Sequence, residues 1–399
     1  MVDLFTTISD WLTGLLEGWG LGPVGVTLVE NLIGAVIIVV FCLTMVVVNI
    51  ILERKLIGRI QDRFGPNRVG PFGIFQTVAD VLKLLSKEII VPDGADKIPY
   101  FLAPAIAVGS VLMIWAVIPF ARTAIATDVS IGALYFFAVS SLGLMAILMA
   151  GWSSNNKYAT LGGFRAVAML VSYEVPNVIA LLIPVALAGT LRMNGIVEAQ
   201  PIWYMFLAPI AMVIFFISNT AEVGRSPFDL LEADSEIVAG FQIEYSGMAF
   251  AMFYLAEFLH AFTISALTAT LFLGGWRGPG AEQIPTLGVV YFFIKTFAVY
   301  FVNIWIRATT PRLRIDQVMA FNWKFLVPLA LANLVVMVIV DKLALATIPG
   351  YALTGTAAAM LPRAGVLFLT NLVLGLLAML WVGARGRRAR RAATAEAAE

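Results

Sequence analysis

Long apolar runs separated by short polar stretches dominate the sequence and predict membrane helices. A helix needs about 20 apolar residues to cross the hydrocarbon core of a bilayer. No linker or low-complexity segment interrupts the runs, so we expect a single membrane domain covering residues 1–399. About nine spans are predicted, at 30–52, 100–120, 131–151, 166–190, 201–220, 247–272, 287–308, 325–345 and 363–384.

Two further segments are amphipathic rather than uniformly apolar. Apolar residues recur with helical period over residues 3–19, which predicts a helix lying in the membrane interface rather than crossing it. In the loop 53–97, Phe75, Val78 and Leu82 share one helical stripe and polar residues follow another, which predicts an amphipathic helix of about 18 residues. This second helix is either an ordinary interfacial helix or a roof over a lipid-like ligand, and the pattern supports both interpretations equally.

The composition excludes most other classes of protein. Hydrophobic residues make up 60% of the 399 residues and charged residues only 13%, against roughly 25% charged in an ordinary soluble domain. A soluble protein of this size would have too little polar surface to cover its outside, which excludes soluble enzymes, nucleic-acid binders and disordered scaffolds. The predicted fold class is therefore an all-α polytopic membrane protein with interfacial amphipathic helices.

Cysteine and histidine are nearly absent from the chain. Cys42 and His260 are the single residues of their types, so we expect no disulfide framework, no thiolate metal or iron–sulfur site, and no haem held by two histidines. The earliest charged residues, Asp3, Asp10 and Glu17, are all acidic, which is the wrong sign for a secretory signal peptide.

Basic residues gather on one side of the predicted bundle. If the loop after the first span is cytoplasmic, 20 of the 26 Lys and Arg residues lie on that side, five lie on the other, and Lys295 lies within a span. Cytoplasmic loops carry the excess of Lys and Arg in membrane proteins, so we expect the N-terminus outside and the C-terminus in the cytoplasm. The basic-then-acidic cytoplasmic tail 385–399 then anchors the last span at an anionic leaflet or, less simply, contacts a partner.

One inner loop reverses this charge pattern. Residues 219–246 and the start of the following span carry one basic residue, Arg225, among seven acidic ones. Asp229, Glu232 and Glu236 stand at i, i+3 and i+7, the spacing of one helix face. The segment is either a solvated acidic face or a row of groups that exchange protons. The seven acids are Glu222, Asp229, Glu232, Asp234, Glu236, Glu244 and Glu257.

Two carboxylates fall inside predicted spans. Glu257 lies in the sixth span, and Glu174 lies in the fourth, beside the helix-disturbing Pro176. A charge at membrane depth costs ~2.5–3.5 kcal/mol on insertion scales, so such residues are functional candidates, and a row of acids from the inner surface to mid-membrane predicts a proton relay. Lys295 could extend the relay or pair with a carboxylate. His260 either joins the relay or is structural, which is the commoner role of a lone histidine on an apolar helix.

A third inner cluster follows the seventh span. Residues 307–324 contain Arg307, Arg312 and Arg314 beside Asp316. Arginines at the end of a span usually anchor it, but three within eight residues could also neutralise the acidic loop. Both interpretations stay open on the sequence.

Three segments together resemble a known family. They are ERKLIGRIQDRFGPNRVGPFG at 53–73, AEVGRSPFDLLEADSEIVAGFQIEYSGMAFAMFYLAEF at 221–258 and RATTPRLRIDQVM at 307–319. Their order and their spacing relative to the spans are similar to those of the H subunit of proton-translocating NADH:quinone oxidoreductase, the bacterial counterpart of mitochondrial NADH dehydrogenase subunit 1. The resemblance covers roughly 50–345 and leaves out the N-terminal helix and the Arg-rich tail.

The resemblance implies a subunit of respiratory complex I in the bacterial inner membrane, not catalytic by itself. Its substrate would be ubiquinone or menaquinone, which enters from the bilayer, and its partners would be other complex I subunits and lipid but no nucleic acid. Iron–sulfur clusters, FMN and NADH would lie on other subunits, with no metal or covalent cofactor here. The resemblance places the quinone tunnel at Arg54, Arg63, Asp80, Lys83, Phe253, Tyr254 and Phe258. It places the proton relay at Glu174, Glu222, Asp229, Glu232, Asp234, Glu236, Glu244 and Glu257.

Three other functions would account for some of the same sequence features. A proton-driven secondary transporter would also hold membrane carboxylates but should show an internal repeat, and neither acidic motif recurs. The membrane subunit of an energy-converting hydrogenase would share the acidic segment, but the loop 53–73 and its amphipathic helix fit the quinone enzymes better. A purely structural anchor for a redox arm would have no use for Glu174 and Glu257.

Overall fold

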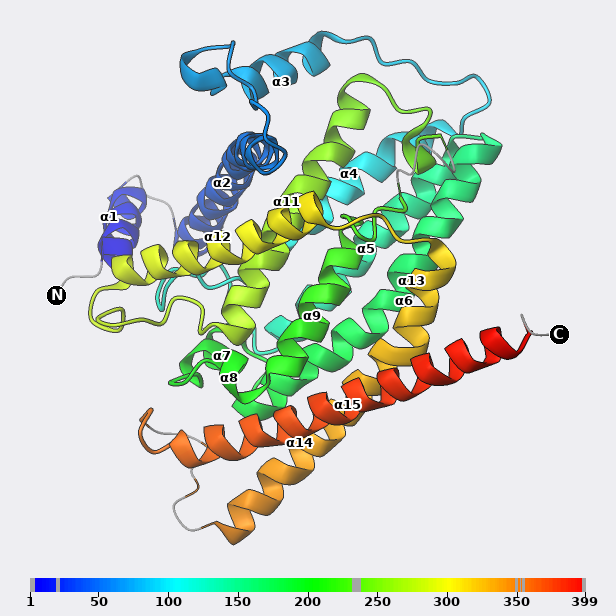
Figure 1. Ribbon diagram of the computed structural model, residues 1–399. Coiled ribbons are helices and arrows are strands. Elements are labelled where there is room, and N and C mark those ends of the chain that lie inside the picture. Colours follow the sequence, from blue (N-terminus) through cyan, green and yellow to red (C-terminus); the bar gives the residue numbers. More distant parts are fainter. Residues whose placement is uncertain are drawn as a thin grey trace.

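The chain forms a bundle of helices without strands in the part that the computed structural model describes, which is residues 4–18, 22–231, 238–348, 351, 353 and 356–396 (Figure 1). This confirms the predicted all-α class. The helices are α1 (Leu4–Gly18), α2 (Pro23–Ile60), α3 (Gln76–Ser86), α4 (Lys97–Ile114), α5 (Gly132–Ser153), α6 (Lys157–Ala188), α7 (Met193–Glu198), α8 (Tyr204–Leu207), α9 (Pro209–Glu222), α11 (Gly247–Phe272), α12 (Pro285–Thr309), α13 (Ile315–Phe321), α14 (Val327–Thr347) and α15 (Leu361–Glu396), with 3-10 turns at Pro71–Gly73 and Gly240–Gln242 and a π-helical turn at Asn322–Leu326 between α13 and α14.

Eight of the described helices are long and apolar enough to cross a membrane, where the sequence predicts about nine spans. The difference lies at the predicted span 201–220, which is divided into the short α8 and the 14-residue α9. Ala208 separates them with φ −138° and ψ 60°. It precedes Pro209, and the residue before a proline is pushed out of the helical region by the proline ring.

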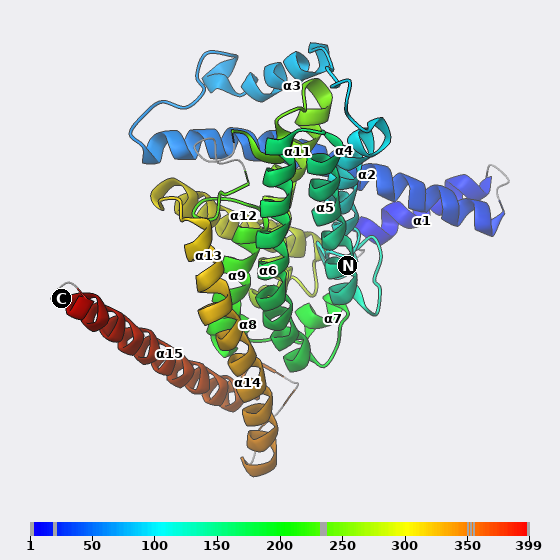
Figure 2. The same ribbon diagram turned by 90° about the vertical axis from the view of Figure 1, so that its right-hand side faces the viewer.

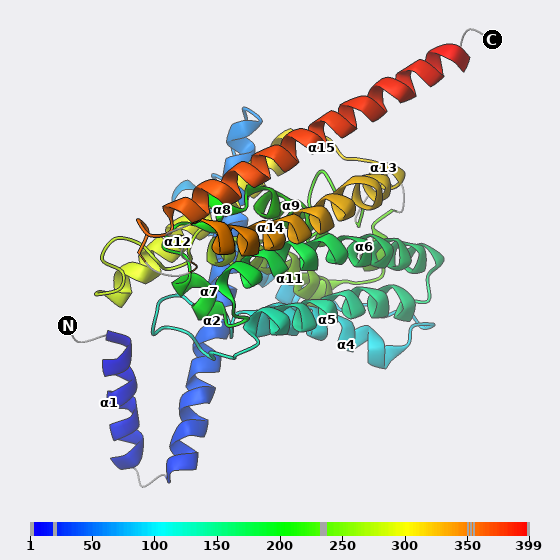
Figure 3. The same ribbon diagram turned by 90° about the horizontal axis from the view of Figure 1, so that it is seen from below.

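Helices α2 and α15 run obliquely to the rest of the bundle. In Figures 2 and 3, α2 crosses the direction shared by α5 and α6, with α1 packed alongside its first half, and the end of α15 projects away from the body. Thr13 on α1 donates a hydrogen bond of 2.5 Å to Glu30 on α2. The residues from Glu53 onward, predicted to begin a loop, continue α2 as far as Ile60.

The predicted amphipathic helix is shorter than its pattern suggests. Helix α3 covers 11 residues and ends at Ser86, after which Lys87 is extended. The following Ile89, Ile90 and Val91 are β-branched, and Val91 precedes Pro92, so the local sequence disfavours further helix. Helix α3 lies across one end of the bundle, the end opposite α7 and α8 (Figures 1 and 2).

Three prolines sit inside long helices without ending them, Pro104 in α4 and Pro176 and Pro184 in α6. Proline has no N–H and leaves the carbonyl four residues earlier without its helical partner. Pro104 in α4 frees the carbonyl of Tyr100, which accepts a 3.1 Å hydrogen bond from the Tyr245 hydroxyl. Pro176 in α6 likewise frees the carbonyl of Ser172, which accepts from the Asn322 amide at 2.5 Å. The carbonyls of Tyr100 and Ser172 are thus bonded by other elements, as a membrane interior demands.

Adjacent glycines on α6 allow two close contacts on different sides. A Cβ on Gly163 would lie 3.2 Å from the Cα of Gly151 on α5, and a Cβ on Gly162 would lie 2.7 Å from the Cα of Gly240. Small residues let helix backbones approach in membranes. Gly162 therefore fixes the first turns of α6 against the segment that leads from the acidic loop into α11.

A buried ion pair ties the last two spans to α6. Asp341 on α14 accepts two hydrogen bonds of 2.9 Å from Arg363 on α15 and one of 2.6 Å from the hydroxyl of Tyr351. Arg363 also donates to the carbonyl of Leu187, near the end of α6, at 3.1 Å. The charges of this outer cluster are therefore compensated within the chain.

Substituting Gly162 by alanine should destabilise the packing around the first turns of α6. The new methyl group would press on backbone atoms, and overpacking of this kind costs about 1–3 kcal/mol. The expected result is that the chain leaves the membrane complex at a lower temperature, measured by native electrophoresis after graded heating. Gly109→Ala on α4, where a Cβ meets nothing within 4 Å, is the matched control and should not lower that temperature. Equal behaviour of the two variants would contradict the packing described.

Candidate functional site

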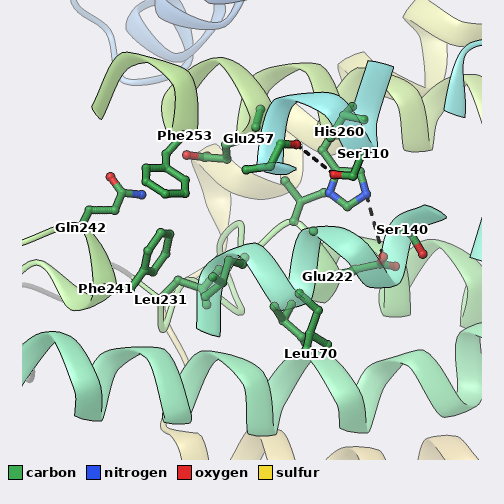
Figure 4. A pocket seen from close by; sticks show the side chains of 18 of the residues that line it. Ser110, Ser140, Leu170, Glu222, Leu231, Phe241, Gln242, Phe253, Glu257 and His260 are labelled. Carbon is green, nitrogen blue, oxygen red and sulfur yellow. Dashed lines mark hydrogen bonds and ion pairs between the residues drawn. The ribbon is translucent and has the colours of Figure 1, made fainter. Parts of the chain in front are cut away.

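A cavity of about 130 Å³ lies among α4, α5, α6, α9 and α11 and is lined by four carboxylates (Figure 4). We call it the acidic cavity. Glu174 reaches it from α6, Glu222 from the last residue of α9, Asp229 from the acidic loop and Glu257 from α11. The structure thus brings together four of the eight predicted relay acids, from four separate segments of the chain.

Glu222 is held in place by neighbouring amides. The amide of Asn177 donates to Glu222 Oε2 at 2.9 Å, and Asn177 and Asn219 exchange two hydrogen bonds of 3.2 and 3.0 Å. The other carboxylate oxygen, Oε1, lies 3.9 Å from Nε2 of His260. One oxygen of Glu222 is therefore anchored while the second faces the cavity.

A buried group of charges lies beside the acidic cavity, and we call it the ion-pair cluster: Glu53, Arg225, Arg307, Glu257 and Tyr300. Glu53 on α2 accepts a 2.6 Å hydrogen bond from Arg225, a 3.2 Å bond from the Tyr300 hydroxyl and a further bond from Arg307. Only 3% of the Glu53 side chain and none of the Arg225 side chain is exposed. The cluster therefore joins α2, the acidic loop, α11 and α12 through charges removed from solvent.

Arg225 has more donors than partners. Its Nε lies 3.8 Å from Glu257, too far for a hydrogen bond, and neither Nε nor Nη2 has a hydrogen-bond partner among the described residues. Its guanidinium also lies 4.9 Å from the centre of the Phe258 ring. Burial lowers the pKa of Arg225, but the combined effect of Glu53, Tyr300 and Glu257 raises it more, so the residue stays cationic.

A second, larger hollow of about 800 Å³ lies on the other side of the cluster. We call it the basic pocket, because arginines and aromatic rings dominate its wall. Arg54 in this wall is oriented by a 2.5 Å bond to Asp80 on α3, which also accepts from Gln76 at 3.2 Å. Arg307 lines both hollows. The wall consists of Glu53, Arg54, Ile57, Arg63, Phe64, Gly65, Pro66, Asn67, Arg68, Gln76, Tyr254, Phe258 and Arg307.

The predicted quinone residues do not all meet in this pocket. Arg54, Arg63, Tyr254 and Phe258 line it, and Asp80 contacts it through Arg54. Phe253 lines the acidic cavity instead. Lys83 is exposed on α3 and is absent from the wall.

The predicted helix face in the acidic loop is wrong at its first position. Asp229 is not helical, and its carboxylate accepts a 2.6 Å hydrogen bond from Arg312. Glu232, Asp234 and Glu236 lie outside the described residues. Glu244 lies away from the cavity, where its carboxylate accepts a 2.6 Å bond from Asn156.

One residue of the third basic cluster pairs with the acidic loop, as the neutralising interpretation expects: Arg312 pairs with Asp229. Arg307 pairs instead with Glu53 of α2. Arg314 pairs only with its exposed neighbour Asp316 at 3.2 Å.

Lys295, which could have paired with a carboxylate, contacts backbone instead. It donates to the carbonyls of Gly275 and Arg277 at 2.9 and 2.7 Å and lies 5.0 Å from the ring centre of Trp203. It therefore fixes the turn that follows α11.

Glu53, Arg225 and Asn177 are site residues that the sequence pattern did not single out. Arg225 left a usable signal, since a lone base among seven acids is an expected partner for a buried carboxylate. Glu53 and Asn177 left none, because a glutamate at the end of a span and an asparagine within one are also common in ordinary packing. In the described ranges, no three His, Cys, Asp or Glu side chains gather in a way that could hold a metal ion.

Comparison with known proteins agrees with this architecture. The family model described as NADH dehydrogenase matches residues 33–338. The H subunit of NADH-quinone oxidoreductase from Dehalococcoides mccartyi (strain CBDB1) is 52% identical over 308 residues, which are 77% of this chain and 86% of that protein. The proteins of the same name from Geobacillus sp. (strain WCH70) and Bacillus mycoides (strain KBAB4) are 48% and 47% identical, over 75% and 77% of this chain and 91% and 93% of theirs.

The fold and the paired charged hollows define a polytopic membrane subunit whose charged residues line two neighbouring hollows between its helices. The chain belongs to the NADH dehydrogenase family, among the H subunits of NADH-quinone oxidoreductase.

Removing the Arg225 side chain should destabilise the assembled protein strongly. Arg225→Ala leaves Glu53 buried with one cation fewer, and breaking a buried pair in this way costs about 3–5 kcal/mol. The expected result is dissociation of the chain from its complex at markedly lower temperature on native gels. Arg314→Ala removes an exposed pair worth at most about 1 kcal/mol and serves as control. If Arg225→Ala were as heat-stable as Arg314→Ala, the ion-pair cluster would not have the structural role assigned to it.

Proposed function

We propose that this chain is the membrane subunit of a proton-pumping NADH:quinone oxidoreductase in which quinone enters the basic pocket and its reduction drives a proton relay through the acidic cavity. The observation that carries the proposal is the ion-pair cluster between the two hollows, with Arg307 in the wall of both. NADH, FMN and iron–sulfur clusters are placed on partner subunits, which deliver the electrons.

The basic pocket suits a quinone head group. Its volume of about 800 Å³ falls in the range of small-molecule sites, roughly 300–1,000 Å³. Tyr254 and Phe258 offer aromatic faces, and Arg54 offers fixed donors for a carbonyl oxygen that becomes negative as electrons arrive. Two electrons and two protons convert the quinone to quinol, so each turnover changes the charge beside the cluster.

The ion-pair cluster can pass that change onward by electrostatics. Arg225 lies between Glu53 and Glu257, bonded to the first and 3.8 Å from the second. A new negative charge in the basic pocket draws the Arg307 and Arg225 cations toward it and makes an ionised Glu257 less favourable. Glu257 then takes up a proton, because the charge states of interacting groups are linked.

The remaining acids continue the path toward the middle of the bundle. Glu257, Glu222 and Glu174 come from three helices and share the walls of one cavity, which has room for several water molecules. Protons released from Glu174 pass to a neighbouring membrane subunit in this proposal. The loops that form the basic pocket face the cytoplasm, with the N-terminus outside, in keeping with the distribution of Lys and Arg.

The pumping step tests the relay. Glu174→Gln and Glu236→Gln keep the size of the side chain but cannot ionise, so we expect the assembled complexes to lose most proton pumping in proteoliposomes. Proton uptake is followed with a pH-sensitive dye during NADH oxidation by quinone. Wild-type pumping in both variants would remove the relay from the mechanism.

The quinone pocket is tested by two cationic residues with different positions. Arg54→Met removes a charge-assisted donor worth about 1.5–3 kcal/mol, so the KM for a short-chain quinone should rise about tenfold or more. Lys83→Met also removes a cation of the segment 53–97, but Lys83 is not part of the pocket wall. The KM of this variant for the same quinone should stay within about twofold of wild type. Equal shifts in both variants would show that the effect is general electrostatics rather than a site at Arg54.

A further inference from the structure

We propose that His260 carries protons between Glu257 and Glu222 across the acidic cavity. The inference rests on the proposed relay and adds to it a proton-transfer residue that is not an acid.

Helix α11 presents Glu257 and His260 to the same hollow. The two residues are three positions apart, so they lie on one face of the helix, and both belong to the wall of the acidic cavity. Figure 4 shows both side chains on the side of α11 that faces the cavity, with Glu222 opposite the imidazole. His260 therefore stands between the acid beside the ion-pair cluster and the acid at the end of α9.

The ring nitrogen that faces Glu222 is free. Nε2 is enclosed by protein and makes no hydrogen bond to any described residue. Its distance of 3.9 Å from Glu222 Oε1 is longer than a hydrogen bond but close enough for an ion pair. A histidine with a purely structural role would be expected to have this buried nitrogen bonded.

Glu222 has one carboxylate oxygen available to the imidazole of His260. Its Oε2 is occupied by the amide of Asn177, so Oε1 is the oxygen left for the imidazole. Ser110 adds a polar atom to the wall of the cavity, and its volume of about 130 Å³ accommodates water between the side chains. A single bridging water, or a closure of about 1 Å, completes the contact.

The transfer moves one proton and changes no oxidation state. The carboxyl group of Glu257 releases its proton to a cavity water, and that water gives a proton to Nε2 of the neutral imidazole. The imidazolium then pairs with the ionised Glu222 and passes the Nε2 proton to Oε1. The step leaves Glu257 ionised, His260 neutral and Glu222 protonated. Only O–H and N–H bonds form and break.

The test compares His260→Gln and His260→Asn with Glu222→Gln in the complete complex reconstituted in proteoliposomes. Both histidine variants can form hydrogen bonds but cannot become cations. We expect about a hundredfold fall in coupled NADH:quinone turnover and in pumping rate, the lower end of what a positioned acid–base residue provides. The KM for quinone should be unchanged, and so should the rate of NADH oxidation by a soluble artificial acceptor. A packing or assembly defect would not leave both quantities unchanged.

Ser140→Ala is the matched control. Ser140 lines the same cavity, but its hydroxyl bonds only to the Phe137 carbonyl of its own helix, at 3.2 Å, so turnover should stay at the wild-type level. If the histidine variants pump normally and Glu222→Gln does not, His260 is structural and the relay stands without it. If Glu222→Gln also pumps normally, the relay itself is wrong. Either histidine variant that assembles is sufficient for the test.

Discussion

The bond between Glu53 and Arg225 is the contact on which the packing around both hollows depends. Two buried charges are costly to remove from water, and their attraction offsets this only where the geometry is good and further bonds are made. Tyr300 and Arg307 supply those bonds. Four segments distant in the sequence must therefore come together before either charge can be buried, so the pair selects one arrangement of α2, α11, α12 and the acidic loop.

The ion-pair cluster forms part of the walls of both hollows, since Arg307 lines the basic pocket and the acidic cavity. In the proposed mechanism, a charge placed in one hollow therefore acts on the partners available in the other without any movement of a helix. Two donors of Arg225, Nε and Nη2, have no hydrogen-bond partner among the described residues. The buried cation can therefore form a new hydrogen bond without first breaking its bond to Glu53. A fully satisfied cluster would be more stable and less responsive.

The sequence predicted the helices well and the site in part. Hydropathy located the spans because each long apolar run must be a helix in a bilayer, and it failed at 201–220, where Pro209 breaks the run. Charge placement identified Glu174 and Glu257, since acids at membrane depth are rare, and it identified Glu222 through the excess of acids in its loop. It could not show that Phe253 lines one hollow and Phe258 the other, nor that Glu53 is buried, because these depend on which helix faces meet. In the sequence, Lys83 is similar to the other basic residues of 53–97. Only the structure shows that it is exposed on α3 and absent from the wall of the basic pocket.

The prolines of α4 and α6 help to determine which segments pack together in the bundle. Between helices in lipid, apolar surfaces fit many alternatives about equally well. A missing N–H singles out one carbonyl on a long helix, and only a suitably placed donor can bond to it. Asn322 bonds to the carbonyl that Pro176 leaves open, and Tyr245 to the one that Pro104 leaves open. The imino acid, usually regarded as an interruption of a helix, here specifies the register between neighbours.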